Sequence, residues 1–130
     1  MAASRWLLLM LALLWSTIAC NPTLAPILNV DESMSVPVSG ERSVERSRQA
    51  IRAGLASKGW KVERDEPGVI VASILAGGHS ARVEIKYTAD RYSIHHLESS
   101  PGLGYDGTNI HRRYNHWIKL LRQAIDRAAQ

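Results

Sequence analysis

The sequence predicts an α+β domain in which an antiparallel sheet of three to four strands carries two helices on one face, in the order (β)αβββα. Two segments, 41–58 and 110–128, place apolar side chains at helical spacing, which favours amphipathic helices. Between them, strand-like runs are separated by short turns, of which Gly77-Gly78 is the clearest. At 130 residues the chain has room for one domain.

The first 19 residues have the three-part layout of a secretory signal peptide. A positive start with Arg5 is followed by an apolar stretch from Trp6 to Trp15 and by the small-residue segment 16–19. The apolar stretch is shorter than the roughly 20 residues that span a bilayer core. We therefore expect residues 1–19 to be a signal peptide and not a permanent membrane helix.

Cys20 follows this leader and is the only cysteine, so an intramolecular disulfide and a cysteine-rich zinc site are excluded. The segment from Thr17 to Cys20 resembles the lipobox of bacterial lipoproteins, although Thr17 stands where leucine is commonest. The resemblance implies that Cys20 carries palmitate and further acyl chains, which together hold a protein stably at a membrane. The alternative is ordinary cleavage after Ala19, which leaves a free thiol.

Asn21 bears on which membrane holds the anchor. In the sorting rule of enterobacteria, an aspartate at this place retains a lipoprotein in the inner membrane. By resemblance to that rule, Asn21 implies the outer membrane, with the protein facing the periplasm. The expected partners are the membrane itself, through lipid on Cys20, and an envelope protein or cell-wall component.

The start of the mature chain predicts a tether. Residues 20–32 contain Pro22 and Pro26 without sustained periodicity, which predicts a lipidated tether before a single domain over residues 33–130. Residues 34–38 alternate apolar and polar side chains, and they predict a short edge strand.

The first helix is expected over residues 41–58, with a cap from Ser39 or Ser43 and an end at Gly59. Its apolar stripe consists of Val44, Ile51 and Leu55. A strand then opens at Trp60, and residues 65–68 supply a turn.

Three further strands and a helix complete the domain. Residues 69–76 and 81–87 form a hairpin around the glycine pair, and residues 91–97 return as a strand with Tyr92, Ile94 and His96 on one face. Residues 99–109 contain Pro101 and three glycines, and they predict a loop. The last helix, 110–128, starts at a cap from Thr108 or Asn109, and its apolar stripe consists of Tyr114, Trp117, Ile118, Leu121 and Ile125.

Charge and histidine placement argue against several functions. The net charge of +4 is spread along the chain without interleaved aromatics, so we expect no nucleic-acid partner. His95 and His96 point to opposite faces of a strand, and His111 and His116 diverge on a helix. We therefore expect no metal and no cofactor, unless the helix brings one histidine over His96.

The sequence also lacks a pattern that is typical of a nucleophilic active site. The serines do not lie in a Gly-x-Ser-x-Gly elbow, and the single thiol is expected to be acylated. Asp106 and Glu98 lie in and near the glycine-rich loop and could form a pair of catalytic carboxylates. The commoner interpretation is that Asp106 is a turn residue and that Glu98 is a solvated residue at the end of a strand. The chain is therefore not expected to be an enzyme.

One segment, Ile110-His-Arg-Arg-Tyr-Asn-His-Trp-Ile118, is distinctive. Preceded by Tyr92-Ser-Ile94, it resembles small proteobacterial envelope lipoproteins of uncharacterised function, which share an I-H-x-x-Y-N-x-W-[IV] helix start. His96 departs from that pattern, because an aromatic side chain would suit the strand better. We expect a structural clamp or binding site formed by His96, His111, Tyr114, Asn115 and Trp117.

The function expected from the sequence is that of a lipid-anchored envelope protein with a non-enzymatic binding or assembly role. The binding surface would be the exposed sheet face or the loop 99–109. The alternative is a small hydrolase or metal-dependent enzyme that uses His96 and His111, and it requires a pocket that gathers those side chains.

Overall fold

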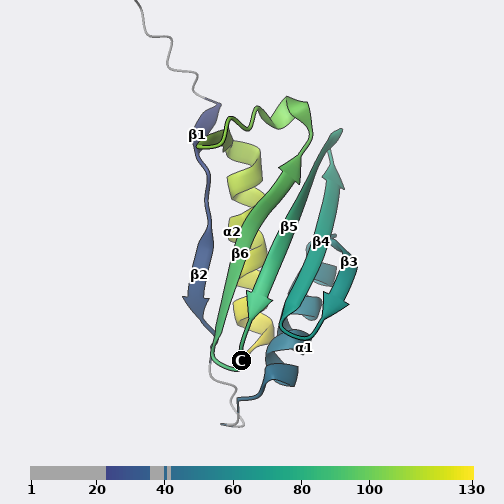
Figure 1. Cartoon of the computed structure of the whole chain (residues 1–130), viewed down its shortest axis with the longest axis vertical. Coiled ribbons are helices and arrows are strands. Elements are labelled where there is room, and N and C mark those ends of the chain that lie inside the picture. The colour runs from purple at the N-terminus through teal and green to yellow at the C-terminus, as the bar shows by residue number, and fades with distance from the viewer. Residues whose placement is uncertain (1–22, 36–39, 41) are drawn as a thin grey trace, which may run out of the picture.

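The computed structural model describes residues 23–35, 40 and 42–130. Within them, a five-stranded antiparallel sheet has the order β2-β6-β5-β4-β3, and β1 and β7 form a separate two-stranded sheet (Figure 1). The elements are β1 (Leu24–Pro26), β2 (Val30–Ser33), α1 (Val44–Ser57), β3 (Lys61–Glu66), β4 (Val69–Ala76), β5 (His79–Tyr87), β6 (Arg91–Ser99), the short 3-10 helix η1 (Pro101–Leu103), β7 (Asn109–His111) and α2 (Arg112–Ala128).

Both helices lie side by side on one face of the five-stranded sheet, and no element of the described residues covers the opposite face (Figure 1). The expected α+β class and the placement of the two helices are therefore confirmed, whereas the expected strand count and the order (β)αβββα are not: two strands precede α1, and a further strand lies between β6 and α2. The additional strands are β1, β2 and β7, all of them four residues or shorter.

Helix α1 starts three residues later than its sequence pattern predicts. Ser43 caps it, because its side chain accepts a hydrogen bond from the Arg46 amide at 3.2 Å. The chain leaves the helix at Gly59, which has a positive φ of 78° that favours glycine. Val44, expected in the core, is 49% exposed because it lies in the first turn.

Ion pairs join α1 to the edge strand β3. Asp65 accepts hydrogen bonds from Arg48 at 2.7 and 3.1 Å and also pairs with Arg52. Hydrogen bonding by Arg48, and then by Arg52, lowers the pKa of Asp65. The edge of the sheet is thereby fastened to the helix above it.

The central hairpins follow the sequence closely. Strand β4 has the expected bounds, Gly77 and Gly78 both have positive φ, and β5 extends the expected strand by two residues. A bulge in the pairing of β5 with β6 lies between Arg82 and Val83, so His96 pairs with Val83 and faces the helices.

Helix α2 starts at Arg112, after an extended segment that pairs with β1. Its cap is His111, whose Nδ1 accepts from the Arg113 amide at 3.0 Å; the expected caps, Thr108 and Asn109, lie before that point. The α2 residues that are fully buried against the sheet and α1 include Tyr114, Ile118, Leu121 and Ile125. Each such side chain contributes roughly 1.5–3 kcal/mol through burial of apolar surface.

The folded part begins earlier than the sequence indicates. Residues 20–32 were expected to be a tether, but Leu24–Pro26 pairs with β7 and Val30–Ser33 pairs with β6. Met34, expected in a strand over 34–38, is buried outside any strand, and residues 36–38 lie outside the described ranges. The described fold therefore begins within the segment that was expected to be a tether.

Candidate functional site

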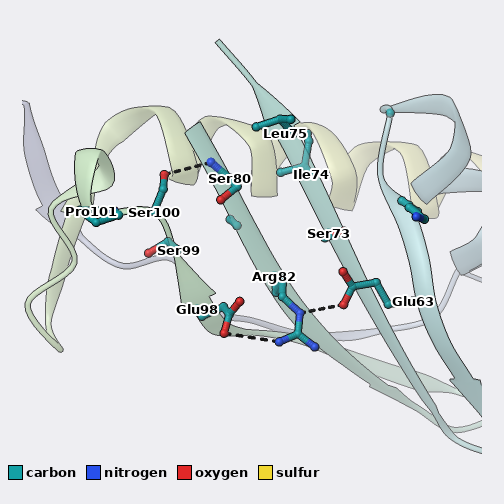
Figure 2. Close-up of a pocket in the computed structure, with 13 residues that line it drawn as sticks. Glu63, Ser73, Ile74, Leu75, Ser80, Arg82, Glu98, Ser99, Ser100 and Pro101 are labelled. Atoms are coloured by element: carbon teal, nitrogen blue, oxygen red, sulfur yellow. Dashed lines mark hydrogen bonds and ion pairs between the residues drawn. The ribbon is translucent and has the colours of Figure 1, made fainter. Parts of the chain in front are cut away.

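A hollow of about 800 Å³ lies on the open face of the sheet, at the end where β4 and β5 turn (Figure 2). Strands β3, β4, β5 and β6 and the start of η1 contribute to it. Its lining includes Lys61, Glu63, Ser73, Leu75, Arg82, Glu98, Ser99, Ser100 and Pro101. The wall thus combines charged groups and hydroxyls with two exposed apolar groups.

Arg82 lies at the centre of this hollow and reaches a carboxylate on each side (Figure 2). Its Nε donates to Glu63 at 2.7 Å, and its Nη1 lies 3.4 Å from Glu98. Hydrogen bonding by Arg82, and then by Ser73, lowers the pKa of Glu63, so this carboxylate stays ionised. Arg82, Glu63 and Glu98 are therefore paired with one another, and with Lys61 the four charges of the hollow sum to zero, so it offers mixed polar contacts without a strong net field.

One side of the hollow is a free sheet edge. The register of β3 with β4 stops at Ser73, which lies opposite Lys61, whereas β4 continues to Ala76 along β5. Within the described residues, the outer backbone edge of 74–76 has no strand beside it. Leu75, 77% exposed, stands on this edge and faces the hollow. Free backbone donors and acceptors at such an edge can pair with another extended chain.

The loop after β6 is held rigidly against the other side of the hollow. The Ser100 amide donates to the Ser80 carbonyl at 2.9 Å, and the Ser80 amide donates to the Ser100 hydroxyl at 3.0 Å. The ring of His79 lies against Gly102, where a Cβ atom would meet it at 2.6 Å. This part of the loop is therefore a fixed wall of the hollow.

His96 belongs to a second depression of about 480 Å³, next to the first. Its ring stacks at a tilt on Tyr105, with centroids 4.1 Å apart, and meets Tyr114 edge-on at 5.4 Å. Its Nε2 lies 2.9 Å from the hydroxyl of Ser99. Burial lowers the pKa of His96, and Glu98 opposes this effect, so the imidazole is favoured in its neutral form.

Tyr114 is fully buried, and its hydroxyl has no hydrogen-bond partner among the described residues. Burial raises the pKa of this phenol above its ordinary value, so it remains neutral at physiological pH. Its edge contact with His96 makes it a support for that ring.

The remaining residues of the expected clamp take separate places. Asn115 accepts from the Leu28 amide and donates to the Pro26 carbonyl, both at 2.9 Å, so it holds the segment between β1 and β2 against α2. Trp117 packs on the core, and His111 caps α2.

No group of three or more His, Cys, Asp or Glu side chains in the described ranges is arranged to hold a metal ion. Asp106 and Glu98 also serve different purposes. Asp106 accepts from the amides of Thr108 and Asn109 at 2.9 and 2.7 Å, whereas Glu98 pairs with Arg82.

The hollow around Arg82 was not found by sequence reasoning, although the alternation over 81–87 places Arg82 on the solvent side of its strand. Its partners come from strands 19 residues before it and 16 residues after it, in registers that depend on two bulges. Cys20 lies outside the described residues, and so do Thr17 and Ala19.

None of the helices in the described part of the chain is long and apolar enough to cross a membrane. In comparisons with known proteins, no family model, curated protein or solved structure matched this chain.

Proposed function

We propose that this protein is a bacterial envelope lipoprotein, anchored through lipid on Cys20 to the periplasmic side of the outer membrane, and that its domain is a non-enzymatic binding module. The occupant of its binding site is an extended segment of an envelope protein, which adds to the free edge of β4 at 74–76. The leader, the resemblance of residues 17–20 to a lipobox and the likeness of the α2 start to small lipoproteins support the anchor.

The observation that carries the binding role is the hollow beside this free edge. An extended peptide gains affinity from backbone hydrogen bonds to an unpaired strand and specificity from side-chain contacts beside it. Leu75 and Pro101 supply apolar contacts, and Ser73 and Arg82 supply polar ones. The fixed wall formed by Ser80 and Ser100 reduces the entropy lost on binding.

The anchor is tested by expressing the full chain and its Cys20→Ala variant in a Gram-negative host. We expect the mature wild-type chain to gain acyl mass and to fractionate with the outer membrane, and we expect the variant to do neither. Unmodified, soluble protein from both chains would contradict the anchor and favour cleavage after Ala19.

The binding site is tested with a photo-crosslinking amino acid at Leu75, and with the same amino acid at Gln49, an exposed position on α1, as the matched control. We expect Leu75 alone to crosslink to one envelope protein. The crosslinked segment, made as a synthetic peptide, should then protect the amide of Leu75 from hydrogen exchange, because the amides of residues 74 and 76 point to β5. Crosslinks to cell-wall glycan, or equal crosslinking from both positions, would reject a protein segment as the occupant.

A second candidate function rests on the contact between Ser99 and His96. A hydroxyl 2.9 Å from a neutral imidazole, at the wall of a depression, is the arrangement in which a histidine can take the serine proton during attack on a carbonyl carbon. The chain would then be a small hydrolase. Among the described residues, no carboxylate is hydrogen-bonded to His96 to orient it, which makes this function second.

A fluorophosphonate probe separates the two functions, because it labels serines that a base activates. The binding module predicts no labelling of the mature chain. Labelling that disappears in Ser99→Ala and persists in Ser100→Ala would instead establish the hydrolase, since the hydroxyl of the neighbouring Ser100 accepts from the Ser80 amide and does not contact His96.

A further inference from the structure

The first described residues of the chain lie at one end of the domain. We call it the tether end, and it consists of β1, the turn between β4 and β5, the loop 100–108 and the start of α2. These segments lie at one end of the molecule (Figure 1). The Arg112 amide donates to the Thr23 carbonyl at 2.8 Å, so the first described residues are fastened to the first residue of α2.

The short distance along the chain brings this end close to the anchor. Thr23 is three residues after Cys20, and three residues span at most about 10 Å when fully extended. An acylated Cys20 would therefore hold Thr23 and Arg112 within roughly one Debye length of the lipid headgroups. If residues 20–32 formed an extended tether, the folded domain would not be held this close to the headgroups.

Exposed apolar side chains gather at the same end. Leu97 and Tyr105 are 45% and 43% exposed, and they line the same depression. The loop that carries Tyr105 contacts β1, because a Cβ atom on Gly104 would lie 3.3 Å from Leu24. Tyrosine is favoured at membrane interfaces, where its ring is partly buried and its hydroxyl stays hydrated.

Cations complete the tether end. Arg112 and Arg113 are exposed, and neither has a carboxylate within ion-pair distance in the described ranges. Arg113 lies over the turn between β4 and β5, where its Nη1 is 2.9 Å from the place a Cβ atom on Gly77 would take. Asp106, the carboxylate of the loop 100–108, accepts hydrogen bonds from two backbone amides of its own loop. Unpaired guanidinium groups suit the phosphates of anionic lipids.

From these observations we infer that the tether end is a membrane-seating surface, on which Tyr105 and Leu97 enter the headgroup region of an anionic phospholipid layer while Arg112 and Arg113 contact its phosphates. The inference rests on the proposed anchor at Cys20. The seating fixes the long axis of the domain upright on the membrane, so that the hollow around Arg82 opens sideways just above the lipid surface.

The test uses the purified acylated protein in vesicles of phosphatidylglycerol and phosphatidylcholine. Once Cys20 is acylated, a cysteine introduced by Tyr105→Cys is the only free thiol and can carry an environment-sensitive fluorophore. The matched control is Val44→Cys, an equally exposed apolar position in the first turn of α1, at the far end of the domain.

We expect the label at position 105 to report an apolar environment in anionic vesicles, and the label at position 44 to report water. Some anchored molecules have the tether end in contact with the membrane and others do not, and the fluorescence of the label measures the ratio of the two. Replacing both charges, Arg112→Gln and Arg113→Gln, should reduce this ratio about 25-fold, since each cation near an anionic surface raises the contact equilibrium about five-fold. The matched change Arg46→Gln, at the far end, should alter this ratio less than two-fold.

The possible failures are distinguishable. If the mass shows acylation but both labels report water, the seating surface is rejected while the anchor stands. Equal signals from the two labels, or an equal effect of Arg46→Gln and the double variant, also reject it. A preparation without acyl mass rejects the anchor, and the inference falls with it.

Discussion

Two buried tyrosines show how one hydroxyl can stabilise the fold while another destabilises it. Both Tyr92 and Tyr114 are at most 1% exposed. The hydroxyl of Tyr92 donates to Asp126 at 2.9 Å, whereas that of Tyr114 has no partner among the described residues. A hydroxyl taken out of water without a partner costs free energy that a paired one recovers.

Phenylalanine at these two positions should therefore have opposite effects. We expect Tyr114→Phe to raise the free energy of unfolding by about 1 kcal/mol, and Tyr92→Phe to lower it by about 1 kcal/mol. Chemical denaturation of the two variants under identical conditions measures both. Destabilisation by Tyr114→Phe would mean that its hydroxyl has a hydrogen-bond partner, for example a bound water.

His96 should make stability depend on pH. Its folded-state pKa lies below the ordinary 6.5, chiefly because of burial. As the pH falls below about 6.5, the unfolded chain takes up a proton that the folded protein does not yet bind, so the free energy of unfolding should decrease. Denaturation curves measured above and below pH 6.5 test this, and His96→Gln should flatten the dependence. His116→Gln, at an exposed position, is the control and should leave it in place.

At the scale of elements, the sequence predicted those whose pattern is local. Helices α1 and α2 and the hairpin of β4 and β5 have periodic apolar side chains and glycine turns within a few residues. Strands β1 and β2 were missed because they are short, contain or follow proline, and pair with partners more than 50 residues away. The late start of α2 has the same cause, since residues 109–111 pair with β1 instead of continuing the helix.

The candidate site was also predicted only in part, for the same reason. The sequence singled out His96, Tyr114 and Asn115 as a group, and the structure places His96 against Tyr114 but turns Asn115 to the segment before β2. The hollow around Arg82 depends on the registers of four strands, and a single alternating run does not reveal which strands lie beside it.

Asn115 should govern whether the segment between β1 and β2 stays docked. We expect Asn115→Ala to lower the free energy of unfolding by about 1–2 kcal/mol, because two hydrogen bonds to the backbone, one of them part-buried and one exposed, are lost. Hydrogen exchange locates the effect. The Leu28 amide should lose protection in Asn115→Ala and keep part of it in Asn115→Asp, which retains the acceptor. Protection of Leu28 in both variants would show that the segment is held by other contacts.

The contact between the two helices depends on Gly54. A Cβ atom there would lie 2.7 Å from Cγ1 of Ile125 and 2.9 Å from its backbone nitrogen. Gly54→Ala should therefore force the helices apart and destabilise the protein by about 1–2 kcal/mol, although alanine is the better helix former. Gln49→Ala, at an exposed α1 position, is the control and should change stability by less than about 0.5 kcal/mol. A thermal scan that ranks Gly54→Ala as stable as wild type would contradict this packing.

At the scale of the whole molecule, the two layers have opposite charge. Helices α1 and α2 contain eight Arg or Lys and two acidic residues, whereas strands β2 to β6 contain five Arg or Lys and seven acidic residues. Ion pairs join the layers along both sheet edges, from Arg48 and Arg52 to Asp65 on β3 and from Arg122 to Glu32 on β2. The layers are thus fastened at their margins as well as through the core.

A single core shared by both layers predicts cooperative unfolding. The buried cluster contains residues from α1, α2 and strands β2 and β4 to β7, so no layer keeps a core when the other is removed. We expect one transition in which the loss of secondary structure by circular dichroism coincides with the change in fluorescence of Trp60 and Trp117. A separate, earlier transition in the fluorescence signal would show that the helices detach before the sheet unfolds.

The edge strand β3 is protected against pairing with other copies of the protein, which matters if many copies are anchored close together on one membrane. Lys61, Glu63, Arg64 and Glu66 line this strand, and a bulge interrupts its pairing between Val62 and Arg64. Charged side chains and an irregular backbone prevent a flat edge from adding an identical edge from a neighbouring copy. Copies confined at high density should therefore resist sheet-to-sheet aggregation along β3, whereas the end of β4, beyond the last pair with β3, lacks this protection.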